Sequence, residues 1–411
     1  MAPGKSSLKA VFAQPPFRTL WLAQFVSVFG DFMALFGVIS LITFRLHGTA
    51  VDVAMATVAY LAPFSFVAPA AGVLVDRWQV KRVMIASDLI RAFIAASLVL
   101  VADVHQIWVV MALLGLVSCF FGPAQSVALR TVVPPQDLLA ANAMLAQAFY
   151  AVRILSPALA GALVAWLTEK ACFWIDAASF LFSASMIARL TVARAPSGGD
   201  RSLRGFGRDF LEGNRFIFTH RGLSFAFLAS AAAMFMLSSF SPLISVYVRD
   251  SLHAGTVFYG AVSSMVGVGL IAGTQAVHRA AKGRSMVDVV TAGLFGLGAG
   301  AGILGGFQSK YTAALSTLTI GAAIAFVMVP AQTLSQKETP PAMQGRVSST
   351  FMSLFSISQV LGLSLSGVLA AKLGIRQLFL AAAAALVILS MAGFFWLRPR
   401  RAAAEATAGS G

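Results

Sequence analysis

Long apolar stretches, separated by short polar breaks, run along almost the whole chain. Each stretch is close to the ~20 residues that an α-helix needs to cross the ~30 Å hydrocarbon core of a bilayer. Twelve such spans are predicted, at residues 19–43, 53–75, 83–102, 107–128, 142–166, 171–190, 222–246, 256–277, 286–306, 311–333, 347–370 and 376–397. The pattern therefore indicates an all-α membrane protein with twelve transmembrane helices.

The second half of the chain repeats the first. The tetrapeptide PAQS at Pro123–Ser126 returns as PAQT at Pro330–Thr333, an offset of 207 residues. Two further matches have an offset of 206 residues: Pro134-Pro135 with Pro340-Pro341, and Leu155–Gly161 with Leu361–Gly367. Many transporters are built from duplicated halves with a site between them. We therefore expect two pseudo-symmetric six-helix bundles.

This duplication predicts the domain organisation. An N-terminal bundle (residues 1–190) and a C-terminal bundle (222–397) are joined by a cytoplasmic linker (191–221) and followed by a disordered tail (398–411). In the linker, apolar residues share one helical face and arginines the other: Leu203, Phe206, Phe210 and Ile217 against Arg204, Arg208 and Arg215. The linker therefore suits either an interfacial helix whose arginines meet lipid headgroups or a loosely ordered basic loop.

Composition and charge agree with a membrane location. Apolar residues make up 58% of the chain and charged residues 11%, whereas about a quarter of the residues of a soluble domain are charged. The net charge of +15 would favour nucleic-acid binding in a soluble protein. Here, 22 of the 30 Lys and Arg residues fall in segments predicted inside and 6 in segments predicted outside. This bias follows the positive-inside rule, and it predicts cytoplasmic termini, a location in the cytoplasmic (inner) membrane and no nucleic-acid partner.

Motifs of catalysis or metal binding are absent from the sequence. It contains neither a P-loop nor HExxH, and Cys119 and Cys172 both lie inside predicted spans. We expect a protein that is not an enzyme and that has no cofactor or metal site. Without a nucleotide-binding segment, uphill movement of a substrate must draw on an ion gradient.

One loop carries a recognisable motif. Between spans 2 and 3 the chain reads Gly72-Val-Leu-Val-Asp76-Arg77-Trp-Gln-Val-Lys81-Arg82. This resembles the signature loop of the major facilitator superfamily, with Gln79 standing where that family usually has glycine. The resemblance implies the major facilitator fold, in which this loop helps to close a cytoplasmic gate.

The expected gate has further members. Asp76 faces the positive N-terminal end of span 11 in this interpretation, and Gly345-Arg346 anchors the loop that precedes that span. Asp88 and Arg91 lie one turn apart near the cytoplasmic end of span 3, and we interpret them as a structural i,i+3 pair of the gate. Positive-inside topology alone would explain the basic residues of the loop, although not Asp76.

Other motifs narrow the resemblance to one branch of the superfamily. They are Ser27–Asp31, Gly122–Gln125, Ala141–Ala143, Arg153–Pro157, Asp176–Phe180 and Gly345–Val347. Together they resemble the branch that contains enterobactin exporters and macrolide efflux pumps. The resemblance implies export of a small molecule from the cytoplasm. We expect the protein to work by alternating access on a partly hydrophobic molecule, as a monomer in contact with membrane lipid and with protons as the coupling ion. Two features depart from the pattern of many drug/proton antiporters. The first arginine near span 4 is Arg130, which lies beyond the end of that span, and the glycine-proline motif of span 5 is only partial.

Charges inside spans are functional candidates, because each costs roughly 2.5–3.5 kcal/mol at mid-helix. Asp31 in span 1 and Arg153 in span 5 lie at similar depths. We expect them to face each other near a central cavity and to take part in proton coupling, or else to form a permanent salt bridge. Four polar residues, Gln24, Ser27, Asn142 and Gln147, line the cavity in this interpretation or bridge neighbouring helices.

Alternative functions remain open on the same fold. They are flipping of a lysophospholipid, import of a nutrient and, least favoured, a membrane sensor that transports nothing. A sensor would be expected to carry an additional soluble domain, for which the sequence offers no segment.

Overall fold

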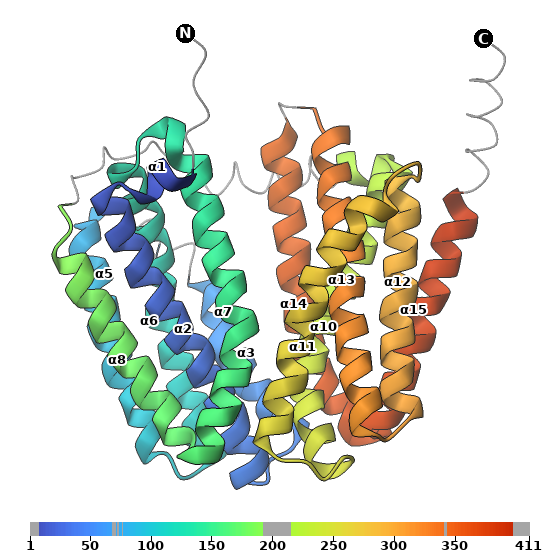
Figure 1. Cartoon of the computed structure of the whole chain (residues 1–411), viewed down its shortest axis with the longest axis horizontal. Helices are drawn as coiled ribbons and strands as arrows, with labels where there is room; N and C mark the ends of the chain where they lie inside the picture. Colours follow the sequence, from blue (N-terminus) through green and yellow to red (C-terminus); the bar gives the residue numbers. More distant parts are fainter. Residues whose placement is uncertain are drawn as a thin grey trace. The chain divides into compact units, whose positions relative to one another are not determined.

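The computed structural model describes residues 8–67, 71, 74–75, 77–191, 215–340 and 343–397. Every regular element among them is a helix (Figure 1). The chain forms two compact units, one of residues 1–199 with 254–264 and the other of residues 200–253 with 265–411. The expected linker helix, apart from residues 215–221, and the expected tail lie outside the described residues.

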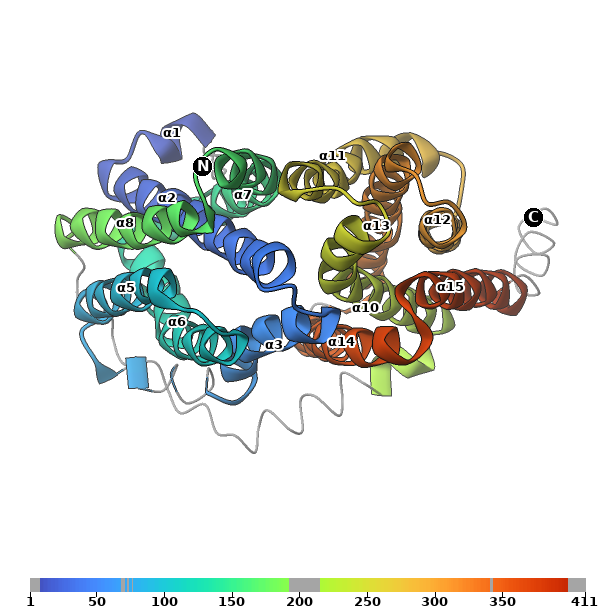
Figure 2. The same ribbon diagram turned by 90° about the horizontal axis from the view of Figure 1, so that it is seen from below.

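The first unit contains seven labelled helices and the start of another. They are α1 (Leu8–Phe12), α2 (Pro15–Ser40), α3 (Ala50–Phe66), α5 (Val80–Ser97), α6 (Val104–Val132), α7 (Leu138–Trp166), α8 (Glu169–Ala188) and the first turns of α11 (Thr256–Ala280). A π-helical turn, Leu41–Arg45, extends α2. Within this unit α2 packs against α7 and α8, α5 packs against α6 and α8, and α3 packs against α6 (Figure 2).

The second unit contains the rest of α11 and five further helices. They are α10 (Arg221–Asp250), α12 (Met286–Gly306), α13 (Lys310–Glu338), α14 (Gln344–Leu373) and α15 (Ile375–Leu397). Here α12 packs against α13 and α15, and α10 packs against α13 and α14.

The predicted spans are confirmed. Among the described residues, 11 helices are long and apolar enough to cross a membrane, and a shorter apolar helix at Ala50–Phe64 supplies the remaining position. The prediction of 286–306 coincides with α12, and that of 376–397 differs from α15 by one residue. The protein is an all-α membrane protein with the helix order expected from the apolar pattern.

The repeat is also present in the helix boundaries. Six helices of the first half have counterparts that begin 206 residues later: α2 and α10, α3 and α11, α5 and α12, α6 and α13, α7 and α14, and α8 and α15. Each member of the α6–α13 pair spans 29 residues and contains an internal proline, Pro123 or Pro330. Each position in these six helices of the first half therefore has a counterpart position 206 residues later in the chain.

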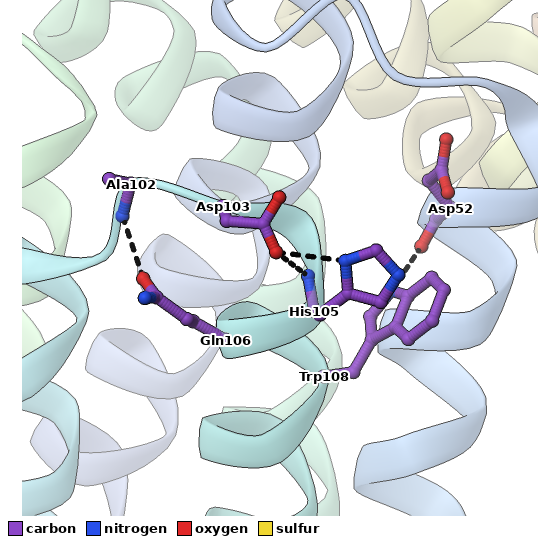
Figure 3. Close-up of polar contacts among 6 residues, drawn as sticks. All are labelled: Asp52, Ala102, Asp103, His105, Gln106 and Trp108. Atoms are coloured by element: carbon purple, nitrogen blue, oxygen red, sulfur yellow. Dashed lines mark hydrogen bonds and ion pairs between the residues drawn. The ribbon is translucent and has the colours of Figure 1, made fainter.

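Side-chain caps fix where two helices of the first unit, α3 and α6, begin. Thr49 and Asp52 form a capping box at the start of α3, which satisfies backbone donors that a helix start would leave free. Asp103 caps α6 by accepting hydrogen bonds from the backbone and the ring Nδ1 of His105, at 2.9 and 2.8 Å (Figure 3). These hydrogen bonds lower the pKa of the Asp103 carboxyl. Trp108 donates to the backbone oxygen of Asp52 at 3.1 Å and so links α6 to α3.

Candidate functional site

A pocket of about 250 Å³ opens among α2, α6 and α7 of the first unit. Its lining residues lie in the N-terminal half of α7, in the C-terminal third of α6 and no further along α2 than Val28. Its polar lining comes from Gln24, Gln125, Ser126 and Asn142, and its aromatic lining from Phe25 and Phe149.

The polar groups of the pocket are neutral and partly free to bind. The Oε1 atom of Gln24 is buried and has no hydrogen-bond partner among the described residues. Asn142 Nδ2 donates to the backbone oxygen of Leu138 at 2.8 Å, which leaves its side-chain carbonyl oxygen available. None of the described residues that line the pocket carries a formal charge. The pocket can therefore accept hydrogen bonds from a ligand without requiring that ligand to be charged.

Neighbouring rings hold the aromatic wall in place. Phe149 makes an edge-to-face contact with Phe32, with ring centroids 5.5 Å apart, and Phe25 stacks on Trp21 at 5.2 Å. Trp21 Nε1 in turn donates to the backbone oxygen of Met144 at 3.2 Å. Because aromatic pairs of this geometry favour particular ring orientations, the wall is positioned before any ligand binds.

The structure brings some of the predicted cavity residues together and not others. Gln24 and Asn142 both line the pocket, and Gln125 of the repeated PAQS motif joins them. Ser27 is buried inside the unit with 1% exposure, and Gln147 is exposed on α7; neither lines this pocket. Gln125 lies in the repeated PAQS motif, but nothing in the sequence alone indicated that it lines a pocket.

A cluster of charged residues is buried elsewhere in the same unit. Arg91 pairs with Asp88 one turn earlier on α5, as their i,i+3 spacing predicted. The two residues are 4% and 0% exposed. The Arg91 guanidinium carbon lies 4.4 Å from the ring centre of Phe121 and 4.3 Å from that of Phe180. The cation is thus held between aromatic faces on α6 and α8, an arrangement that favours positive charge.

Two further carboxylates belong to this cluster. Asp176 on α8 is 1% exposed, and its Oδ1 has no hydrogen-bond partner among the described residues. Asp31 on α2 is within electrostatic range of Asp176 and Arg91. Tyr60 of α3 interacts electrostatically with Asp31, Arg91 and Asp176, and the Ser118 side chain lies beside its hydroxyl. The Ser118 hydroxyl nevertheless completes no hydrogen bond of acceptable geometry with a described residue.

The charged partners of Asp31 differ from those expected. Asp31 interacts electrostatically with Arg91, Asp88 and Asp176, and no ion pair joins it to Arg153 among the described residues. Arg153 is instead exposed on α7. Asp176, named above only as part of the motif Asp176–Phe180, lies seven residues after Glu169, the first residue of α8, and is buried inside the bundle. Asp88 and Arg91 therefore belong to a four-residue cluster, in which Asp31 is half-buried and the other three residues are buried, as well as to the predicted i,i+3 pair.

The predicted gate is described only in part. Arg77 and Arg82 are exposed, and Lys81 is half-buried. Gly72 and Asp76 lie outside the described residues, while Gly345 and Arg346 lie in the first turn of α14, where the structure does not describe their side chains. The gate therefore stays a prediction.

Comparison with known proteins identifies the family. The model of the Major Facilitator Superfamily matches residues 20–362 and 288–411. The chain belongs to this superfamily. The uncharacterized MFS-type transporter YfiS of Bacillus subtilis (strain 168) is 26% identical over 390 residues, which cover 92% of each chain. Macrolide efflux protein A of Streptococcus pyogenes is 28% identical over 377 residues, covering 89% of this chain and 91% of the relative.

Solved structures show the same fold at lower sequence identity. The crystal structure of nucleoside transporter NupG has a TM-score of 0.71, covering 93% of this chain and 99% of that chain at 14% identity. Such a likeness extends to the fold alone. Together with the family match, it makes this protein an integral membrane transporter with a small-molecule substrate.

Proposed function

We propose that the protein exports a small, partly hydrophobic molecule from the cytoplasm by alternating access and in exchange for protons. The pocket among α2, α6 and α7 carries this proposal, because it combines aromatic walls with neutral amide groups. Ligand pockets of this kind use apolar surface for affinity and a few polar groups for orientation. A relative named macrolide efflux protein A, aligned over 91% of its length, supports export as the direction.

The pocket also indicates what part of a substrate it would hold. Its volume of about 250 Å³ lies just below the range of ~300–1,000 Å³ for sites that enclose a drug-sized ligand. We therefore expect it to bind one ring-sized portion of a larger molecule. Gln24 Oε1 would accept a hydrogen bond from a hydroxyl or amide group of that portion, because a buried carbonyl oxygen without a donor is costly.

Proton exchange is proposed from the energy source and the buried charges. The sequence contains no nucleotide-binding motif, and each proton that crosses 100 mV supplies roughly 2.3 kcal/mol. Asp31 is the proposed proton carrier because it is a carboxylate within a membrane span and makes no ion pair with a described residue. The basic bias of the loops supports cytoplasmic termini in the inner membrane, with the loop at Gly72–Arg82 as the inner gate.

Drug accumulation in cells provides the test. Cells that express the protein would be loaded with a macrolide, a hydrophobic cationic dye or a siderophore, with and without a protonophore. We expect lower accumulation of at least one compound and loss of that difference with the protonophore. An unchanged accumulation across the panel, with the protein shown to be in the membrane, would contradict the proposal and turn attention to lipid substrates.

A further inference from the structure

We propose that Asp31 on α2 and Asp176 on α8 form a shared proton-binding site where these two helices meet. The Asp88–Arg91 pair on α5 forms the third side of this site. The role of this site in transport rests on the proposed function, whereas proton binding itself does not. The site is separate from the pocket, because none of these four residues lines that pocket.

The charge balance of the cluster calls for a proton. Arg91 and Asp88 neutralise each other through their ion pair. Asp31 and Asp176 form no ion pair with any described residue, so their ionised forms would leave two negative charges uncompensated. Burying an unpaired charge is costly, and two neighbouring carboxylates resist ionising together. One proton held between Asp31 and Asp176 lowers both penalties.

Buried polar atoms without partners provide a second, independent indication. Within the cluster, Asp176 Oδ1 and Arg91 Nε are buried and lack a hydrogen-bond partner in the described part of the chain, as does Ser183 Oγ farther along α8. Ser183 is 0% exposed and lies beside Asp88, although it completes no hydrogen bond with it. Buried polar groups are nearly always satisfied in proteins, so this group is arranged for a bound species or a second protonation state.

The second unit serves as an internal comparison. At an offset of 206 residues, Asp31, Asp88, Arg91 and Asp176 correspond to Leu237, Leu294, Leu297 and Ala382. Leu294 and Leu297 are 0% exposed, much like Asp88 and Arg91. The repeated helices thus form with apolar residues at all four positions. Since apolar replacements of buried charges are often neutral or stabilising, the helix framework does not require these charges, which points to a function for them.

Arg91 favours a proton over a metal cation at this site. Its guanidinium is fixed between Phe121 and Phe180, and it lies within electrostatic range of Asp31 and Asp176. A permanent positive charge at this distance repels Na⁺, which must sit between several oxygen ligands, whereas a proton resides on a carboxylate itself. Two further groups belong to the surroundings of the site: Tyr60 on α3, which is near Asp31, and Arg153 on α7, a helix that packs against α2. Arg153 pairs with neither carboxylate among the described residues.

Infrared spectroscopy of the purified protein in lipid, with its aspartates labelled with ¹³C, tests the proposal without any substrate. We expect a protonated-aspartate carbonyl band at neutral pH that disappears as the pH is raised. Asp31→Asn and Asp176→Asn should each remove it, because the proton is shared. The matched control is Asp103→Asn, which changes an exposed cap outside the bundle and should leave the band unchanged.

Three results would overturn the inference. They are absence of the band in the wild-type protein, persistence of the band in either Asp31→Asn or Asp176→Asn, and loss of the band when NaCl replaces KCl at constant pH. The last would assign the site to Na⁺. If one variant fails to fold, the pH titration of the wild-type protein and the exchange of KCl for NaCl still show whether the site binds a proton. A protein with the expected band but no export would contradict only the proposed function; protonophore-sensitive export without the band would contradict only the shared site.

Discussion

Gly30 of α2 lies directly against Asp176 of α8: a Cβ atom added at Gly30 would be 2.7 Å from Asp176 Oδ1 and would also collide with Ser179. This close approach brings the chain segment Gly30-Asp31 to the buried carboxylate of α8. We predict that Gly30→Ala destabilises the protein by about 1–3 kcal/mol, the usual cost of overpacking. Thermal unfolding in detergent measures the change.

Gly122 on α6 is the matched control for Gly30. It is also a helical glycine, but a Cβ atom there would meet nothing within 4 Å. Gly122→Ala should therefore raise stability by up to about 1 kcal/mol, because alanine favours the helix. Equal effects of the two substitutions would show that the α2–α8 contact does not depend on the absence of a side chain at Gly30.

The Asp88–Arg91 pair yields a prediction from a double-mutant cycle. Arg91→Leu alone should destabilise the protein by about 3–5 kcal/mol, because it leaves Asp88 buried without its partner. The double variant Asp88→Leu/Arg91→Leu reproduces the residues at the counterpart positions, Leu294 and Leu297. Its stability should return to within about 1 kcal/mol of the wild type. Chemical unfolding of the three variants measures the coupling, and a double variant no more stable than Arg91→Leu would contradict the comparison between units.

The helices were predictable from the sequence, whereas the partners of Asp31 were not. Apolar length determines where a span begins and ends, which is why the predictions nearly coincide with α12 and α15. The pairing of Asp31 with Arg153 was inferred from their depth, but depth along two helices does not determine which faces meet. The position of Gly30 against Asp176 determines this instead.

The sequence did contain a signal that would have found Asp176. At the offset of the repeat, this aspartate corresponds to Ala382, and Asp31, Asp88 and Arg91 all correspond to leucines. Charged residues whose counterparts in the other half are all apolar are not needed to form the helices that both halves share. Such residues are therefore candidates for a function specific to one half. The pocket, by contrast, depends on side-chain packing of Phe25 and Phe149, which no spacing rule supplies.

Asp31→Asn should abolish proton-driven export while leaving the protein in the membrane. Asparagine has nearly the same shape but cannot take up and release a proton, so substrate accumulation should match that of cells without the protein. Arg153→Gln should retain most of the export, since Arg153 is exposed and forms no ion pair with a described residue. Transport assays with an imposed pH gradient compare them. Wild-type rates in Asp31→Asn would remove this residue from coupling, and equal losses in both would favour the pairing inferred from depth.

Gln24 and Asn142 should determine how tightly a substrate binds. Both line the pocket, and replacing either with alanine removes one neutral hydrogen-bonding group next to the ligand. Such a bond contributes roughly 0.5–1.5 kcal/mol, so we expect KM for an exported substrate to rise by about 2- to 10-fold while the maximal rate changes little. Gln147→Ala is the control, because Gln147 is exposed on the same helix as Asn142 and lies outside the pocket. Concentration-dependent transport into inverted vesicles measures KM for each variant. A KM that rises for Gln147→Ala and stays constant for Gln24→Ala would place substrate binding on another face of α7.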